Sequence, residues 1–125
     1  MKVVDTSAWL EWLARKPTAR TLAPLLPDRA SWIVPTIVQF ELAKYLAREG
    51  GETEVDRMLA FSNTCIVSPL STAIAVSAAE AAKTYRLPMA DAIIYATARA
   101  YRADLLTCDA HFKDLDGVVY IAKDA

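Results

Sequence analysis

The apolar and polar positions of this chain predict short strands that alternate with helices. Brief runs of aliphatic residues, typical of buried strands, separate longer stretches whose apolar residues recur every three or four positions, as in amphipathic helices. Strands are expected at residues 2–4, 31–34, 65–67, 104–107 and 118–121. Helices are expected at residues 8–14, 17–26, 36–49, 52–61, 72–85 and 88–102, with a short turn over 110–115.

This alternation predicts an α/β fold, a three-layer sandwich in which helices flank a central, mainly parallel sheet of about five strands. The sequence contains no internal repeat, linker or low-complexity segment, so residues 1–125 are expected to form a single domain. A chain of 125 residues can bury one core but is too short for two.

Several helix boundaries carry local signals. Thr36 and Gln39 have the spacing of a capping box at the start of the third helix. The pair Gly50–Gly51 is expected to end that helix. Pro88 suits the first position of the last helix, where a missing N–H costs nothing.

One charge, Asp91, lies inside the apolar stretch of residues 88–98. Its helical neighbours are Ile94, Tyr95 and Ala98, so its carboxylate does not lie on a polar helix face. A carboxylate in such surroundings needs a cation, a hydrogen-bond donor or a metal ion. Taken alone, Asp91 is equally compatible with a simple preference for the helix N-terminus and with a functional site.

Three other acids follow strands in the predicted fold. Asp5 ends the first strand, Asp109 follows the fourth strand within two residues, and Glu41 lies about one turn into the helix after the second strand. Asp5 and Asp109 could instead cap the segments that follow them, and Glu41 could pair with Lys44. Because parallel α/β folds place their sites outside the carboxyl ends of strands, we expect all four acids to face one crevice.

Four clustered carboxylates repel one another, and a hard divalent cation cancels that repulsion. Oxygen ligands suit Mg²⁺ or Mn²⁺ better than zinc, and His111 is the only histidine, which argues against a histidine-based zinc hydrolase. Since Mg²⁺ pairs naturally with phosphate substrates, the expected reaction is metal-assisted phosphodiester hydrolysis.

Charge and composition add limits on partners and location. The chain has 14 Lys and Arg and 15 Asp and Glu, so nucleic acid would have to bind a local patch or through metal ions. Cys65 and Cys108 lack the spacing of a zinc or redox pair and are expected to be buried free thiols of a cytoplasmic protein. No signal peptide and no membrane association are expected, because the sequence contains neither a leader pattern nor an apolar run of about 18 residues.

In their order along the chain, these motifs resemble those of PIN-domain ribonucleases, specifically the VapC toxins of VapBC toxin–antitoxin modules. The matching pieces are residues 3–7 (Val-Val-Asp-Thr-Ser), Glu41, residues 89–94 (Met-Ala-Asp-Ala-Ile-Ile), and residues 106–109 (Leu-Thr-Cys-Asp) with Phe112. The resemblance covers the whole chain, and it is the ordered set of pieces that is specific.

The resemblance implies a PIN-like sandwich with the activity of a Mg²⁺- or Mn²⁺-dependent endoribonuclease that acts as a toxin. It assigns both metal binding and catalysis to the four acids, Asp5, Glu41, Asp91 and Asp109. Ser7 and Thr107 match polar positions that support the site, although they could equally be ordinary turn and strand-end residues. RNA as substrate, a VapB-like antitoxin as partner and a homodimer are also implied, whereas no residue is assigned to RNA contact.

Other functions remain open at this stage. A catalytically silent PIN-like interaction module would keep the fold without the chemistry. A receiver-like signalling domain needs an acid at the end of the third strand, where residues 64–68 read Thr-Cys-Ile-Val-Ser. A phosphatase with Asp-x-Asp after the first strand is disfavoured because Ser7 occupies the second acidic position.

The first two predicted helices carry more apolar side chains than a small domain easily buries on their inner faces. These residues are Trp9, Trp12, Leu13, Leu22, Leu25 and Leu26. One interpretation is ordinary core. The other is that part of this surface forms a groove for an amphipathic segment of the antitoxin.

Overall fold

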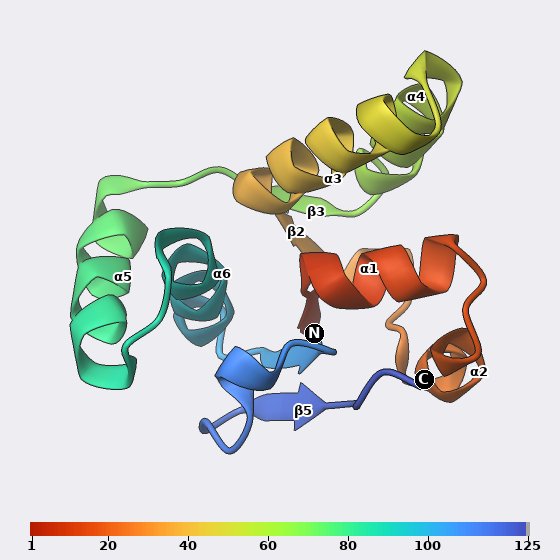
Figure 1. Cartoon of the computed structure of the whole chain (residues 1–125). Helices are drawn as coiled ribbons and strands as arrows, with labels where there is room; N and C mark the ends of the chain where they lie inside the picture. Colours follow the sequence, from red (N-terminus) through yellow and green to blue (C-terminus); the bar gives the residue numbers. More distant parts are fainter. Residues whose placement is uncertain (125) are drawn as a thin grey trace.

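A computed structural model describes residues 1–124, which form a five-stranded sheet with helices packed around it (Figure 1). The strands are β1 (Lys2–Val4), β2 (Trp32–Pro35), β3 (Ile66–Ser68), β4 (Asp104–Thr107) and β5 (Val118–Tyr120). The α-helices are α1 (Thr6–Leu13), α2 (Thr18–Leu22), α3 (Thr36–Glu49), α4 (Glu52–Ser62), α5 (Thr72–Tyr85) and α6 (Met89–Ala100). Short 3₁₀ helices are η1 (Ala23–Leu25), η2 (Arg29–Ser31) and η3 (Ala110–Phe112).

The strand order is β3-β2-β1-β4-β5, and all neighbouring strands pair in parallel. The chain builds outward from β1 to β3, then crosses back to place β4 and β5 on the other side of β1. This confirms the predicted α/β sandwich. It also argues against a receiver-like domain, because that fold has the order 2-1-3-4-5.

Helices cover both faces of the sheet. Helix α6 packs on β1, β2 and β4, with α5 beside it, whereas α1 contacts β4 and α3 contacts β2. Figure 1 shows α5 and α6 on one side of the molecule and α1 and α2 on the other, while α3 and α4 form a helical hairpin. This is the arrangement expected when parallel strands are joined by crossover helices.

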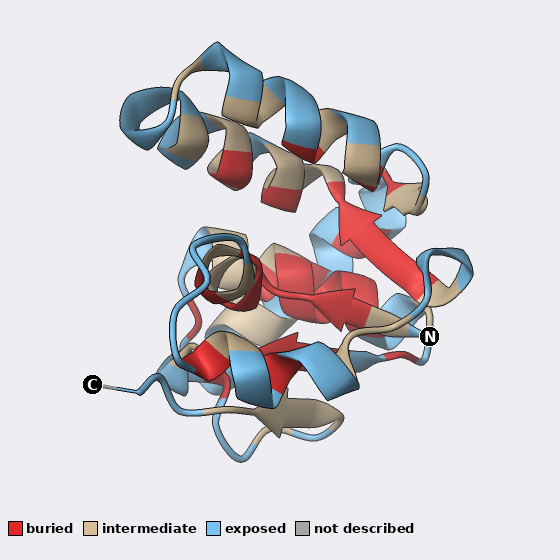
Figure 2. Cartoon of the chain, turned by 90° about the vertical axis from the view of Figure 1, so that its right-hand side faces the viewer, coloured by how far each residue is buried: buried red, intermediate tan, exposed pale blue. Residues whose placement is uncertain are grey.

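The three central strands carry continuous apolar runs because both of their faces are covered. Fully buried side chains of these strands include Val3, Val4, Ile33, Val34, Leu105 and Leu106. The edge strand β5 is only half-buried (Figure 2). Within residues 1–124, no helix combines the length and the apolar character needed to cross a bilayer.

An aromatic cluster joins α1 to the sheet and to α4. The rings of Trp9, Trp12, Trp32 and Phe61 lie with their centroids 4.9 to 5.8 Å apart, largely in tilted or edge-on contacts. Trp9 and Trp32 are buried, and their ring N–H groups have no hydrogen-bond partner among the described residues. Trp9 is therefore core, whereas Trp12 is only partly buried and Leu13 is exposed, so the groove interpretation stays a prediction.

The prediction of one helix over residues 17–26 is wrong. Helix α2 ends at Leu22 and the chain tightens into the 3₁₀ turn η1, which contains Pro24. Proline has no N–H for an α-helical hydrogen bond, and its ring obstructs the preceding turn. The turn η2 before β2 was not predicted either, because three residues leave too weak a pattern.

The predicted capping box is also wrong, although α3 does begin at Thr36. Pro35 occupies the N-cap, no side chain caps the helix, and Gln39 instead donates to Ser62 Oγ of α4 at 3.0 Å. Gly51, at φ 90°, lies between α3 and α4, as the predicted helix end requires. Pro88 is the N-cap of α6 and not its first helical residue.

Candidate active site

The predicted acids gather where the strand order of the sheet reverses. The backbone N–H of Asp5, directly after β1, donates to the carbonyl of Leu106 in β4 at 2.9 Å. Asp109 follows β4, the other strand at this reversal. Parallel α/β sheets form a ligand crevice at such a reversal, outside the carboxyl ends of the strands. The fold therefore brings Asp5 and Asp109 to the place where such sheets bind ligands.

The carboxylate of Asp5 is held by two hydroxyl groups. It is 3% exposed, and its Oδ2 accepts hydrogen bonds from Ser7 Oγ at 2.6 Å and Thr107 Oγ1 at 2.8 Å. Ser7 Oγ also accepts the backbone N–H of Cys108 at 3.0 Å. Asp5 is the N-cap residue of α1, as the sequence allowed, but its side chain makes no cap hydrogen bond. Ser7 and Thr107 orient its carboxylate instead.

Burial raises the pKa of Asp5 from 3.8 to about 6. The hydrogen bonds from Ser7 and Thr107 oppose this rise, and the negative charges of Asp91 and Asp109 add to it. The ionised carboxylate is therefore costly in this position unless a cation lies nearby.

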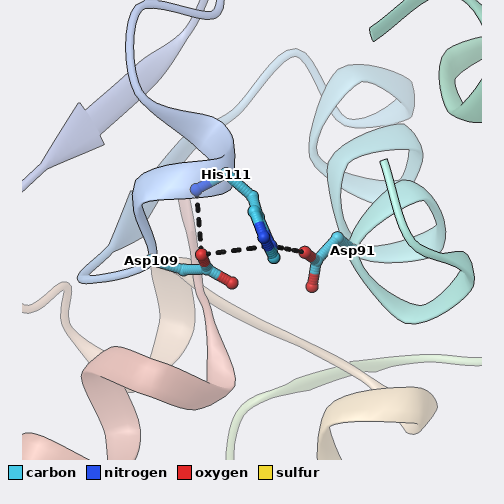
Figure 3. A group of neighbouring side chains, drawn as sticks. All are labelled: Asp91, Asp109 and His111. Carbon is cyan, nitrogen blue, oxygen red and sulfur yellow. Dashed lines mark hydrogen bonds and ion pairs between the residues drawn. The ribbon is translucent and has the colours of Figure 1, made fainter. Parts of the chain in front are cut away.

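A second group consists of Asp91 in α6, Asp109 and His111 (Figure 3). The ring nitrogen Nδ1 of His111 lies 2.9 Å from Asp91 Oδ2 and 3.3 Å from Asp109 Oδ1. Ligand atoms from all three residues lie within 4.8 Å of one another. Among the described residues, no other group of three His, Cys, Asp or Glu side chains is spaced for a metal ion.

The electrostatics of this group favour a bound cation. Burial raises the pKa of Asp91, the hydrogen bond with His111 lowers it, and the charge of Asp109 raises it again. The hydrogen bond with Asp91 and the charge of Asp109 both raise the pKa of His111. The two carboxylates therefore favour the protonated, positively charged form of the imidazole.

Asp109 also caps the turn that follows it, as the sequence allowed. Its Oδ1 accepts the backbone N–H of His111 at 2.9 Å and caps the turn η3. Its own N–H donates to Thr107 Oγ1 at 2.9 Å. Capping and ligation do not exclude each other, because a carboxylate offers two oxygens and several lone pairs.

Glu41 lies outside the tight group. Its Oε1 accepts a hydrogen bond from Thr6 Oγ1 at 2.7 Å, which ties α3 to the first residue of α1. Its charge contributes to the raised pKa of Asp91, so it faces the same region. No ion pair between Glu41 and Lys44 forms in the part of the chain that the structure describes.

Sequence reasoning missed His111 as a member of the site. The residue served only as an argument against a zinc hydrolase, yet its ring contacts two of the four predicted acids. The available signal was its place two residues after Asp109, in a turn too short to carry it away from the strand end.

Comparison with known proteins identifies similar folds. A family model described as PIN domain matches residues 2–118. No curated protein sequence matches the chain significantly. A toxin–antitoxin complex from Klebsiella pneumoniae contains a similar chain, with a TM-score of 0.82 and 22% identity over 95% of this chain and 96% of that one.

Two further solved structures are similar over nearly their whole length. VapC20 from Mycobacterium tuberculosis, described as a Sarcin-Ricin loop cleaving toxin, has a TM-score of 0.76 and 21% identity, covering 98% of this chain and 99% of that one. FitAcB from Neisseria gonorrhoeae has a TM-score of 0.75 and 24% identity, covering 97% of each chain. At these identities the likeness establishes the fold.

The raised pKa of Asp5 predicts how the stability of the metal-free protein depends on pH. Between its unfolded value of 3.8 and its folded value of about 6, the folded state binds more protons than the unfolded state. The Asp5 contribution to the free energy of unfolding therefore falls as pH rises from about 4 to about 6. Asp5→Asn removes this loss, so at pH 7 the free energy of unfolding of the variant should exceed that of the parent by up to about 3 kcal/mol.

Denaturant unfolding in the presence of a chelator, at steps from pH 4 to pH 7, measures the difference between the two proteins. The advantage of Asp5→Asn should shrink towards the acidic end of this range. A parent that gains stability relative to the variant as pH rises would show that the pKa of Asp5 is not raised.

Proposed function

Because the chain belongs to the PIN domain family, we propose that residues 1–125 form a single PIN domain with metal-dependent endoribonuclease activity, acting as the toxin of a toxin–antitoxin module. The observation that carries this proposal is the convergence of Asp5, Asp91 and Asp109 at the strand reversal, with Glu41 nearby. Similar folds are described as part of a toxin–antitoxin complex and as a toxin that cleaves the Sarcin-Ricin loop, which supports RNA as the substrate class.

The donor set fits Mg²⁺ or Mn²⁺. Four carboxylates supply hard oxygen ligands, and burial and mutual repulsion raise the pKa values of Asp5 and Asp91 in the absence of a cation. We assign metal binding and catalysis to Asp5, Glu41, Asp91 and Asp109. A bound divalent ion at this site supplies Lewis acidity towards a phosphodiester and makes a water molecule more acidic.

The residues of the chain then have separate tasks. Ser7 and Thr107 orient the carboxylate of Asp5, and their two hydrogen bonds to Oδ2 lower its pKa against the effect of burial. Asp91 comes from α6, and Asp109 follows β4 directly, with its N–H bonded to the Thr107 hydroxyl that also contacts Asp5. Together these carboxylates would hold the ion, and the ion would offset their repulsion of a phosphate group.

We further propose that the antitoxin binds a groove formed by α1, α3 and α4. A hollow of about 240 Å³ there is lined by aromatic and aliphatic side chains that include Trp12, Leu13, Tyr45 and Met58. A second, larger hollow between α1 and α2 is also lined by Trp12 and Leu13. An apolar helix face of a partner is the natural occupant of such a surface.

We also propose a cytoplasmic location, because both cysteines are free thiols.

Asp91→Asn tests the nuclease proposal. We expect RNA cleavage with Mg²⁺ or Mn²⁺ to fall by at least about 100-fold, since even outer-sphere partners of metal sites contribute 10- to 100-fold. The fold should persist or gain stability without metal, because neutralisation relieves repulsion. Either ion should raise the melting temperature of the parent and much less that of the variant.

Asp56→Asn, the same change at an exposed position on α4, is the matched control and should cleave RNA as the parent does. A marked fall in the melting temperature of metal-free Asp91→Asn would indicate a structural role for Asp91. A parent that cleaves no RNA with either ion, while binding its antitoxin, would favour the catalytically silent interaction module.

Leu13→Glu and Trp12→Ala test the groove. Leu13 is 39% exposed, so a charge there should leave the fold and cleavage intact while weakening antitoxin binding by about tenfold or more. Trp12 also contacts the aromatic cluster, so Trp12→Ala should additionally lower stability. Calorimetric titration with the antitoxin measures the effect, and unchanged affinity in Leu13→Glu would place the partner elsewhere.

We also propose a homodimer in which a second copy covers the outer face of α5 and α6. This face contains an apolar hollow of about 320 Å³ lined mainly by alanines of α5, with Met89 and Ile93. Val76 and Met89 beside it are 59% and 75% exposed. Such exposed apolar area is typical of an interaction surface.

Sedimentation at micromolar concentration should therefore give a dimer for the parent, and Val76→Glu should shift it to monomer with unchanged helix content. Leu13→Glu should stay dimeric, while Val76→Glu should keep its antitoxin affinity. A monomeric parent at these concentrations would contradict the dimer.

A further inference from the structure

We propose that His111 is a ligand of the metal centre, so that the site binds transition-metal ions such as Mn²⁺, Co²⁺ and Zn²⁺ more tightly than Mg²⁺. The proposal rests on the proposed function only in taking Asp91 and Asp109 as metal-binding residues. It adds one nitrogen donor to a centre that sequence reasoning treated as composed of oxygen alone.

The positions of the donor atoms fit a shared ion. Nδ1 of His111 is 2.9 Å from Asp91 Oδ2 and 3.3 Å from Asp109 Oδ1. On an octahedral ion with bonds of about 2.1 Å, adjacent ligand atoms lie about 3 Å apart. Figure 3 shows the imidazole between the two carboxylates, which reach it from the turn η3 and from helix α6. Since the ligand atoms of all three residues lie within 4.8 Å of one another, small side-chain shifts would bring them onto one cation.

The backbone of the turn places His111 beside the two carboxylates. The N–H of His111 donates to Asp109 Oδ1 at 2.9 Å, and the next residue, Phe112, is fully buried and anchors the turn. The side chain of His111 is itself 60% exposed, so packing neither fixes it nor blocks the approach of an ion. Its contacts with the two carboxylates are therefore the main restraint on the ring.

A nitrogen donor changes which ions the site prefers. Mg²⁺ favours oxygen ligands, whereas imidazole suits Zn²⁺ and other transition-metal ions, whose affinities rise along the series from Mn²⁺ to Co²⁺ and beyond. An all-carboxylate centre would discriminate less between these ions and Mg²⁺. The alternative is that His111 only bridges the carboxylates while no ion is bound and leaves when one arrives.

Nuclear magnetic resonance of the imidazole nitrogens distinguishes these cases directly. His111 is the only histidine, so a tag-free, ¹⁵N-labelled protein gives a single pair of ring signals. Addition of Zn²⁺, a diamagnetic probe, without RNA should shift the Nδ1 signal selectively, and Mg²⁺ should not reproduce this shift. A ring whose Nδ1 signal does not respond to Zn²⁺ would overturn the proposal.

Affinities provide a second test. His111→Ala should weaken Mn²⁺ and Co²⁺ binding by about tenfold or more, and Mg²⁺ binding by less than about threefold. His111→Asn places an amide near Nδ1 and should keep Mg²⁺ binding without restoring the preference for Co²⁺. Calorimetric titration of each ion into the folded full-length variants measures these values. Equal losses for all three ions, or no loss, would contradict ligation by His111.

Asp91→Asn separates this inference from the proposed function, because it should weaken the binding of every ion. If the His111 variants bind Co²⁺ as the parent does and still cleave RNA, only the ligand role of His111 fails. If Asp91→Asn binds all ions and cleaves RNA normally, the metal site and the proposed nuclease centre fail together.

Discussion

The parallel pairing of β1 with β4 is the constraint on which the site depends. Its register places Val4 beside Leu106, and the next backbone hydrogen bond brings Asp5 against the end of β4. A slip of one residue would turn each side chain of β1 to the opposite face of the sheet. The contact between Asp5 and the Thr107 hydroxyl therefore depends on a ladder formed by apolar residues that have no chemical role themselves.

The fold tolerates a site that works against its own stability. Asp5 is buried with a raised pKa, and its repulsion from Asp91 and Asp109 adds to the cost. Hydroxyl donors and the His111 imidazole offset part of this cost, and the aliphatic core of the sheet outweighs the rest. Such local instability is common at cation-binding sites, because binding of the ion to the folded protein offsets the lost stability.

Helix α1 connects the two surfaces to which we assign function. Its N-terminus follows Asp5 and carries Ser7, whereas Trp12 and Leu13 near its other end line the apolar hollows. The buried ring of Trp9 fixes the helix between them. The crevice and the groove thus share one short rigid element, although different forces hold their residues: hydrogen bonds at one end and aromatic packing at the other.

The sequence by itself determined the alternation of strands and helices and the placement of Asp5 and Asp109 at strand ends, because apolar periodicity acts over a few neighbouring residues. The strand order, the contact of Ser7 with Thr107 a hundred residues away and the position of the His111 ring were decided only by the tertiary structure. A side chain forms hydrogen bonds with whichever groups the fold brings within reach, whatever their separation along the sequence. The Asp5 carboxylate therefore accepts hydrogen bonds from two hydroxyls, one of them on Thr107 at the far end of the chain, and none from the backbone N–H groups of the helix that begins beside it.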